Sequence, residues 1–235
     1  MSTVEGGGNI ITDGLVLLLD AANSKSYPGT GTTWSDLSRG GNNGTLTNGS
    51  TFNSGNGGSI VFGGSNVYVA TNYIPTIGTG NITYSVWFKT STSQTGGLIG
   101  IRQSPTTVQC VLVICNPVGA AGTNLYMSSF DGTIVRAGST TETYIDNKWY
   151  NAVMVHTSTS DTLYVNGVSV KTNTSATQNI TVTTNLLIGC NPNNNTPLSG
   201  WAFNGNISNS LVYNRALSST EISQNFNATR ARFGI

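Results

Sequence analysis

The chain has 235 residues, of which 37% are hydrophobic and only 8% are charged, and its formal net charge is +1. The hydrophobic fraction is enough for a core, which argues against disorder, and the length suits a single β-sandwich domain. No basic stripe and no 18-residue apolar run is present, so we expect neither nucleic-acid binding nor membrane insertion.

In chain order, we expect an N-terminal arm of residues 1–13 before the first strand, with Gly6, Gly7 and Gly8 as a hinge within it. A domain then spans residues 14–228, and residues 229–235 form a tail. Many short strands with turn signals and one late helix predict an all-β jelly-roll sandwich. The expected strands are 15–19, 59–62, 67–70, 82–89, 97–101, 108–114, 125–129, 133–136, 149–156, 161–165, 168–171, 186–188 and 207–213.

Two strand segments allow sharper predictions. Within 82–89, the alternate residues Ile82, Tyr84, Val86 and Phe88 are expected to face the core. The segment 108–115 places Cys110 and Cys115 on opposite faces, and we interpret these and Cys190 as buried free thiols.

The dipeptide Asn-Gly at 166–167 predicts a type I′ hairpin turn, because both residues tolerate positive φ. This register places Val165 opposite Val168 and Leu163 opposite Val170. The hairpin is therefore expected to carry a continuous apolar face.

The single expected helix, 219–227, has a clear start signal. Ser218 and Glu221 have the spacing of a capping box, and Leu217 and Ile222 that of a hydrophobic staple.

This C-terminal pattern, F-N-G-x-I at 203–207 followed by Y-N-R-A-L-S-x-x-E-I at 213–222, resembles the signature of laminin-G-like domains. These belong to the concanavalin A-like lectin/glucanase superfamily, and further similar segments appear in the same order across residues 14–228. The resemblance implies a concanavalin A-like jelly roll. It does not imply one activity, because this fold carries lectins, hydrolases and structural modules.

Enzymatic chemistry is not expected. No two of the nine acidic residues lie at i and i+2 on an expected strand, and the E-x-D-x-x-E pattern of laminarinase-like relatives is absent. The sole histidine, His156, is interpreted as a strand-end residue in packing or solvent contact. No G-x-S-x-G nucleophile elbow and no paired zinc-ligand spacing occurs.

No cofactor is predicted. Many relatives hold calcium at a rim loop, but Gly63 and Val67 stand here where the family pattern has aspartates. Asn66 and Asp131 are left as weak calcium candidates.

Sugar binding needs an exposed aromatic surface beside amide or carboxylate partners. The candidates for glycan contact are Trp34, Tyr73, Asn193, Asn195 and Trp201, which lie in or near loops rich in Gly, Asn and Pro. The alternative for each aromatic is that it caps the core.

Two functions therefore remain open. The chain resembles laminin-G-like proteins of bacteriophages, which implies a non-catalytic virion surface protein: a capsid decoration protein, fibre or tail adhesin that binds glycans. Its partners would be capsid or tail proteins and further copies of itself, with the arm docking on the assembly and with Phe233 and Ile235 either docking there or covering the domain's own sheet. The alternative is a secreted or cell-surface lectin, or a glycan-processing enzyme, of the same fold.

Overall fold

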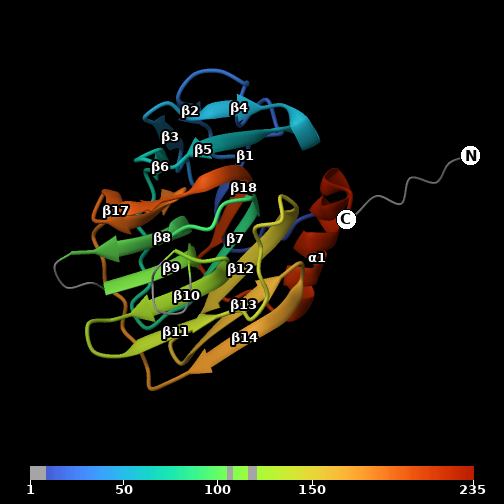
Figure 1. The fold of residues 1–235 in the computed structure, drawn as a ribbon. Helices are drawn as coiled ribbons and strands as arrows, with labels where there is room; N and C mark the ends of the chain where they lie inside the picture. Colours follow the sequence, from blue (N-terminus) through green and yellow to red (C-terminus); the bar gives the residue numbers. More distant parts are fainter. Residues whose placement is uncertain (1–8, 105–107, 116–120) are drawn as a thin grey trace, which may run out of the picture.

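The computed structural model describes residues 9–104, 108–115 and 121–235, except for the side chain of Cys115. These residues form two antiparallel eight-stranded sheets that pack face to face, with one helix at the side (Figure 1). The prediction of an all-β sandwich with a short C-terminal helix is therefore confirmed. No helix in these ranges is long and apolar enough to span a membrane.

The first sheet, sheet A, has the order β14-β13-β12-β7-β18-β5-β4, with β1 also paired to β18. Its strands are β1 (Leu15–Asp20), β4 (Thr51–Asn53), β5 (Ser59–Gly63), β7 (Ile82–Lys89), β12 (Trp149–His156), β13 (Ser160–Val165), β14 (Val168–Thr174) and β18 (Asn204–Tyr213).

The second sheet, sheet B, has the order β11-β10-β9-β8-β15-β6-β3-β2. Its strands are β2 (Thr33–Trp34), β3 (Gly44–Thr47), β6 (Tyr68–Thr71), β8 (Gly96–Gln103), β9 (Val108–Cys115), β10 (Asn124–Phe130), β11 (Val135–Ser139) and β15 (Leu187–Ile188). A separate hairpin is formed by β16 (Cys190–Asn193) and β17 (Thr196–Ala202). Short 3-10 turns cover Gly55–Gly57 and Arg230–Phe233, the latter called η2.

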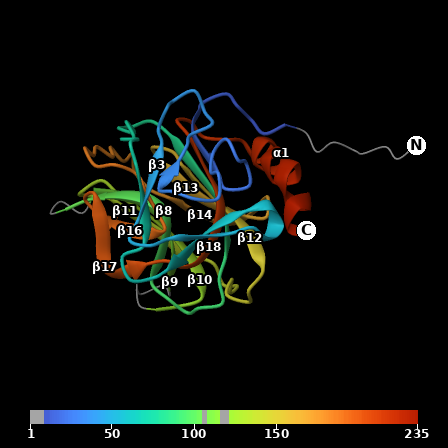
Figure 2. The same cartoon turned by 90° about the horizontal axis from the view of Figure 1, so that it is seen from above.

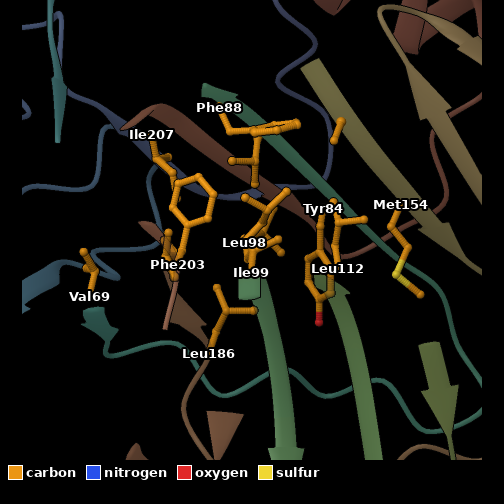
Figure 3. Packing of buried hydrophobic residues seen from close by; sticks show 14 of the residues in the cluster. Val69, Tyr84, Phe88, Leu98, Ile99, Leu112, Met154, Leu186, Phe203 and Ile207 are labelled. Carbon is orange, nitrogen blue, oxygen red and sulfur yellow. The ribbon is translucent and has the colours of Figure 1, made fainter. Parts of the chain in front are cut away.

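The core fills the space between the two sheets. All four alternate residues of β7 that the sequence places inside are buried there, as predicted. Figure 3 shows Tyr84 and Phe88 among Leu98, Leu112 and Phe203. Because β7 lies in the middle of sheet A, its other face is buried as well, and Trp87 is only 1% exposed.

Helix α1 (Ser219–Thr229) and η2 cover the outer face of sheet A. The ring of Phe233 stacks on Trp87 with centroids 4.0 Å apart and also contacts Trp149 at 4.9 Å. Phe233 thus covers the domain's own sheet, which is the alternative to docking on a partner for this side chain. Ile235 is 43% exposed.

Residues 9–13, expected to belong to the arm, also contact this face. The amide of Ile11 donates to Asn225 Oδ1 at 2.8 Å, and the Tyr213 hydroxyl donates to the Ile11 carbonyl at 2.9 Å. The glycine hinge at residues 6–8 lies outside the described residues.

The helix begins as the sequence predicts. Ser218 and Glu221 form the capping box, and Leu217 and Ile222 are buried in one cluster. Arg215 adds an ion pair to Glu221, with Nη2 and Oε1 2.6 Å apart.

In the hairpin between β13 and β14, the predicted pairing is found only at the turn. Asn166 and Gly167 have φ of 49° and 81°, and Val165 pairs with Val168. A β-bulge then shifts the register, so that Leu163 pairs with Lys171 rather than Val170. The expected continuous apolar face is therefore wrong: β14 is an edge strand, and Val168 and Val170 are 65% and 37% exposed.

A buried polar cluster joins the two sheets. Asp161 of sheet A accepts hydrogen bonds from His156 Nδ1 at 2.7 Å and from the Ser129 hydroxyl of sheet B. Arg136 Nη1 lies 3.7 Å from Asp161 Oδ1, and its Nη2 donates to Gln178. His156 is thus a core residue. Because the carboxylate lies between Ser129 and His156, the cluster does not have the nucleophile-to-base contact of a Ser-His-Asp site.

The free-thiol interpretation holds for Cys110 and Cys190, which are buried and unpaired. Burial raises the pKa of both thiols above the ordinary value, so neither is a reactive thiolate.

Candidate ligand-binding surface

The two outer faces of the sandwich differ. Helix α1 lies on one side of the molecule and the β16–β17 hairpin on the other, as both views show (Figures 1 and 2). The helix covers sheet A, whereas the hairpin lies over β8 of sheet B. The candidate surface is the outer face of sheet B beside this hairpin.

One row of side chains crosses four strands of this face. Arg102 of β8 is paired with Gln109 of β9, Gln109 with Phe130 of β10, and Phe130 with Val135 of β11. Directly paired residues share a face of the sheet. These four side chains line a hollow of about 410 Å³, called here the Arg102 hollow.

The next rows along the same face contain Val111 paired with Ser128, and Val113 paired with Tyr126. Both valines are buried, and Tyr126 and Trp201 pack on them. Two partly exposed aromatic rings therefore lie on the same outer face as the Arg102 hollow.

Gly97 allows the hairpin to lie directly on β8. A Cβ atom at this position would be only 2.0 Å from the backbone of Cys190 and Asn191, so any side chain would push β16 away. Two hydrogen bonds then fix the hairpin: the Asn194 amide donates to the Arg102 carbonyl at 3.0 Å, and the Thr95 side-chain hydroxyl donates to the Gly200 carbonyl at 2.7 Å. This arrangement carries Asn193 and Trp201 onto the surface.

The guanidinium of Arg102 makes few polar interactions with the rest of the described chain. Its Nη1 donates to Asn193 Oδ1 at 3.4 Å, which is a long hydrogen bond. Within the part of the chain that the structure describes, no carboxylate lies within ion-pair distance of its guanidinium. Partial burial lowers the pKa of Arg102 from its ordinary value, but the group stays charged at neutral pH.

The predicted glycan residues separate into two groups. Trp201 and Asn193 lie on this surface, and Asn195 lies in the hairpin turn, where its Oδ1 accepts from the Asn185 amide at 2.8 Å. Trp34 is fully buried in the core, so the prediction that its ring contacts a ligand is wrong. Tyr73 packs against the core away from this face.

Sequence reasoning missed Arg102, Gln109, Tyr126 and Phe130. A signal was present, because in the segment 124–130 the inward residues Leu125 and Met127 alternate with the outward residues Tyr126, Ser128 and Phe130. This is the period-two alternation of a strand with two different faces. It indicates an outward aromatic pair but cannot show what lies over it.

The calcium candidates do not come together. Asn66 precedes β6 and Asp131 follows β10, and three strands, β9, β8 and β15, lie between those two in sheet B. Burial would raise the pKa of Asp131, but hydrogen bonds from the backbone amides of Ile134, Thr133 and Asn179 outweigh it and lower the pKa. These amides already occupy its oxygens. No group of three or more His, Cys, Asp or Glu side chains suited to a metal occurs among the described residues.

Several solved structures share this fold at low sequence identity. Domain 4 of the extracellular arabinanase AbnA of Geobacillus stearothermophilus, solved with arabinotriose, has a TM-score of 0.70 and 17% identity, covering 92% of this chain and 99% of that one. The binding domain of Paraclostridial Mosquitocidal Protein 1 has a TM-score of 0.68 and 16% identity, covering 92% and 52%. Trypanosoma rangeli sialidase has a TM-score of 0.61 and 17% identity, covering 94% and 34%.

The chain therefore spans about half of the toxin binding domain and a third of the sialidase. None of these three is a bacteriophage structural protein, so the expected likeness to such proteins stays a prediction. A search of curated proteins finds no match. A family model described as the concanavalin A-like lectin/glucanases superfamily matches residues 62–223. Taken with the two packed sheets, this match shows that the chain belongs to the concanavalin A-like lectin/glucanases superfamily.

Proposed function

We propose that the chain is a non-catalytic glycan-binding domain whose ligand lies on the outer face of sheet B beside the β16–β17 hairpin. One observation carries the proposal: aromatic rings and hydrogen-bonding side chains share the sandwich face that α1 leaves free. Tyr126, Phe130 and Trp201 offer surfaces for the apolar faces of sugar rings. Arg102, Gln109 and Asn193 offer partners for hydroxyl groups. The arabinotriose complex of the Geobacillus domain supports a saccharide ligand for this fold.

The proposed absence of catalysis rests on the positions of the carboxylates. Glycoside hydrolysis generally uses two carboxyl groups on either side of the bond. Asp161 is buried in the core, while Asp20 and Glu221 are paired with Arg232 and Arg215. Among the residues that the structure describes, no acidic side chain lines the Arg102 hollow. The alternative of a glycan-processing enzyme predicts release of reducing ends from a polysaccharide, which purified protein should not produce.

The test is glycan binding by a Trp201→Ala variant. Screening the wild-type protein on an array of plant, algal and bacterial polysaccharides should identify a ligand, and calorimetry should give its dissociation constant. Losing one aromatic stacking contact costs about 0.5–1.5 kcal/mol of binding free energy, in addition to what the buried apolar area contributes. The affinity should therefore fall about tenfold or more. Phe52→Ala is the matched control, because it truncates a half-buried aromatic on β4 of the other sheet. Equal affinities of both variants would contradict the proposed surface.

The proposed setting is multivalent display on a virion, with capsid or tail proteins as partners. The toxin binding domains support it indirectly, since there the same fold forms part of a longer binding chain. Many linked copies would raise avidity by about 10²–10⁴ without any new contact. Imaging of particles from the source with an antibody to this chain tests the setting. A chain found only in the culture supernatant or on cells would favour the secreted or cell-surface lectin.

A further inference from the structure

We infer that the ligand of this surface is an anionic glycan, whose carboxylate or sulfate group binds the Arg102 guanidinium while its sugar ring lies against Phe130. The inference rests on the proposed function and adds the chemical class of the ligand. The observation behind it is a comparison of the arginines: Arg102 differs from the other partly or fully buried ones in having no carboxylate partner among the described residues.

The chain has six arginines, and the described residues include all of them. Arg39 and Arg230 are exposed. The other four are partly or fully buried, and three of these have a carboxylate within 4 Å: Arg136 with Asp161, Arg215 with Glu221 and Arg232 with Asp20. Arg102 is the exception. A partly desolvated cation is costly without a counter-charge, and a bound anion would supply one.

The position of Arg102 suits this role. The hollow of about 410 Å³ is within the range of small-ligand sites, and Gln109, Phe130 and Val135 are the other described residues that line it. Gln109 is held by a hydrogen bond from its Nε2 to the Ser128 hydroxyl at 2.8 Å, which leaves its carbonyl oxygen to accept from a sugar hydroxyl. Phe130 and Val135 form an apolar wall on the same row of the sheet.

A neutral sugar and an anionic sugar use such a site differently. Hydroxyl groups accept single hydrogen bonds from a guanidinium, whereas a carboxylate or sulfate accepts two parallel ones and also neutralises its charge. The long contact from Arg102 to Asn193 is its one hydrogen bond from the side chain to a described residue. Among these described contacts, a bound anion would therefore displace only this one long hydrogen bond of Arg102.

The experiment compares polymers that share a backbone and differ in charge. Polygalacturonate is paired with its methyl ester, and dextran sulfate with dextran, at constant physiological ionic strength. We expect the wild-type protein to prefer at least one charged member about tenfold or more over its neutral partner. Arg102→Gln should abolish this preference, because the charged polymer should lose far more affinity than the neutral one, which loses at most single hydrogen bonds. Arg39→Gln makes the same change of net charge at an exposed arginine and should keep the preference.

The outcomes distinguish a failure of the anionic-ligand inference from a failure of the proposed glycan-binding function. Binding that is sensitive to Trp201→Ala but indifferent to ligand charge would overturn the anionic class and leave the proposed function intact. An equal loss in Arg102→Gln and Arg39→Gln would also overturn it, because general electrostatic attraction would then explain the preference. Failure of the wild-type protein to bind any saccharide would contradict both. If the protein prefers the charged member of only one pair, that pair shows whether the site binds a carboxylate or a sulfate. Thermal unfolding of each variant confirms that the fold is kept.

Discussion

Removing the charge of Asp161 should strongly destabilise the domain. In Asp161→Asn the side chain keeps nearly the same shape, so packing is almost unchanged. The Arg136 guanidinium, however, stays in the core without the one carboxylate that faces it. We therefore expect the loss to arise from electrostatics rather than from a cavity.

The magnitude follows from burial. The side chains of Arg136 and Asp161 are 1% and 0% exposed, and breaking such a buried pair by removing one partner costs about 3–5 kcal/mol. Domains of this kind are stable by about 5–15 kcal/mol, so a large part of the total would be lost. Changing Arg136→Met as well should recover some of it, because no uncompensated charge then remains in the core.

Urea unfolding, followed by tryptophan fluorescence, measures these differences. Asp146→Asn is the matched control: its pair with Lys148 is shorter, at 2.7 Å, but the two side chains are 41% and 74% exposed. Such a surface pair is worth about 0–1 kcal/mol. If Asp161→Asn lost no more stability than Asp146→Asn, the reasoning that burial decides the cost would be refuted.

Three further predictions concern the C-terminal half. Phe233→Ala should cost about 3 kcal/mol and shift the fluorescence of Trp87 to the red, because the ring that covers the indole is lost; an unchanged spectrum would contradict the packing. Gly167→Val should lower stability by at least about 1 kcal/mol, since its φ is 81°, and equal melting temperatures would remove the type I′ turn. Glu221 should make stability fall in acid. The side chain of Arg215, and after it the backbone amide of Ser218, lowers the pKa of Glu221 from 4.5 to about 2. The contribution of Glu221 to the free energy of unfolding is therefore complete above pH 4.5 and disappears as the pH falls toward 2. The Glu221→Gln variant should lack this part of the pH dependence of stability.

The sequence predicts features that depend on neighbours along the chain. The capping box of α1, the core face of β7 and the turn at 166–167 are all confirmed, because each depends on spacings within a few residues. The bulge in β14 was not predicted, since an inserted residue leaves the alternation readable in two registers. Local composition around Trp34 indicated a loop, but only the folded structure shows that its ring turns inward.

The candidate surface was the least predictable part. Its members come from β8, β9, β10, β11 and the β16–β17 hairpin, and Asn193 and Trp201 are about 90 residues from Arg102 and Gln109 in the chain. Nothing in the local pattern around Arg102 shows that it lacks a carboxylate partner. That property depends on which distant segments lie next to it, and strand pairing decides this.

The way in which the hairpin rests on β8 has an evolutionary consequence. Gly97 brings two main chains together, so the close approach of β16 to β8 depends on main-chain groups and on the missing Cβ, and not on which side chains the hairpin exposes. Substitutions there can alter the sugar that is recognised without disturbing the packed interior between the sheets. Selection for a new ligand would then act on residues 193–201 and on the outward positions of β8 to β10. Homologous domains should diverge fastest at those places and slowest at the glycine beneath them.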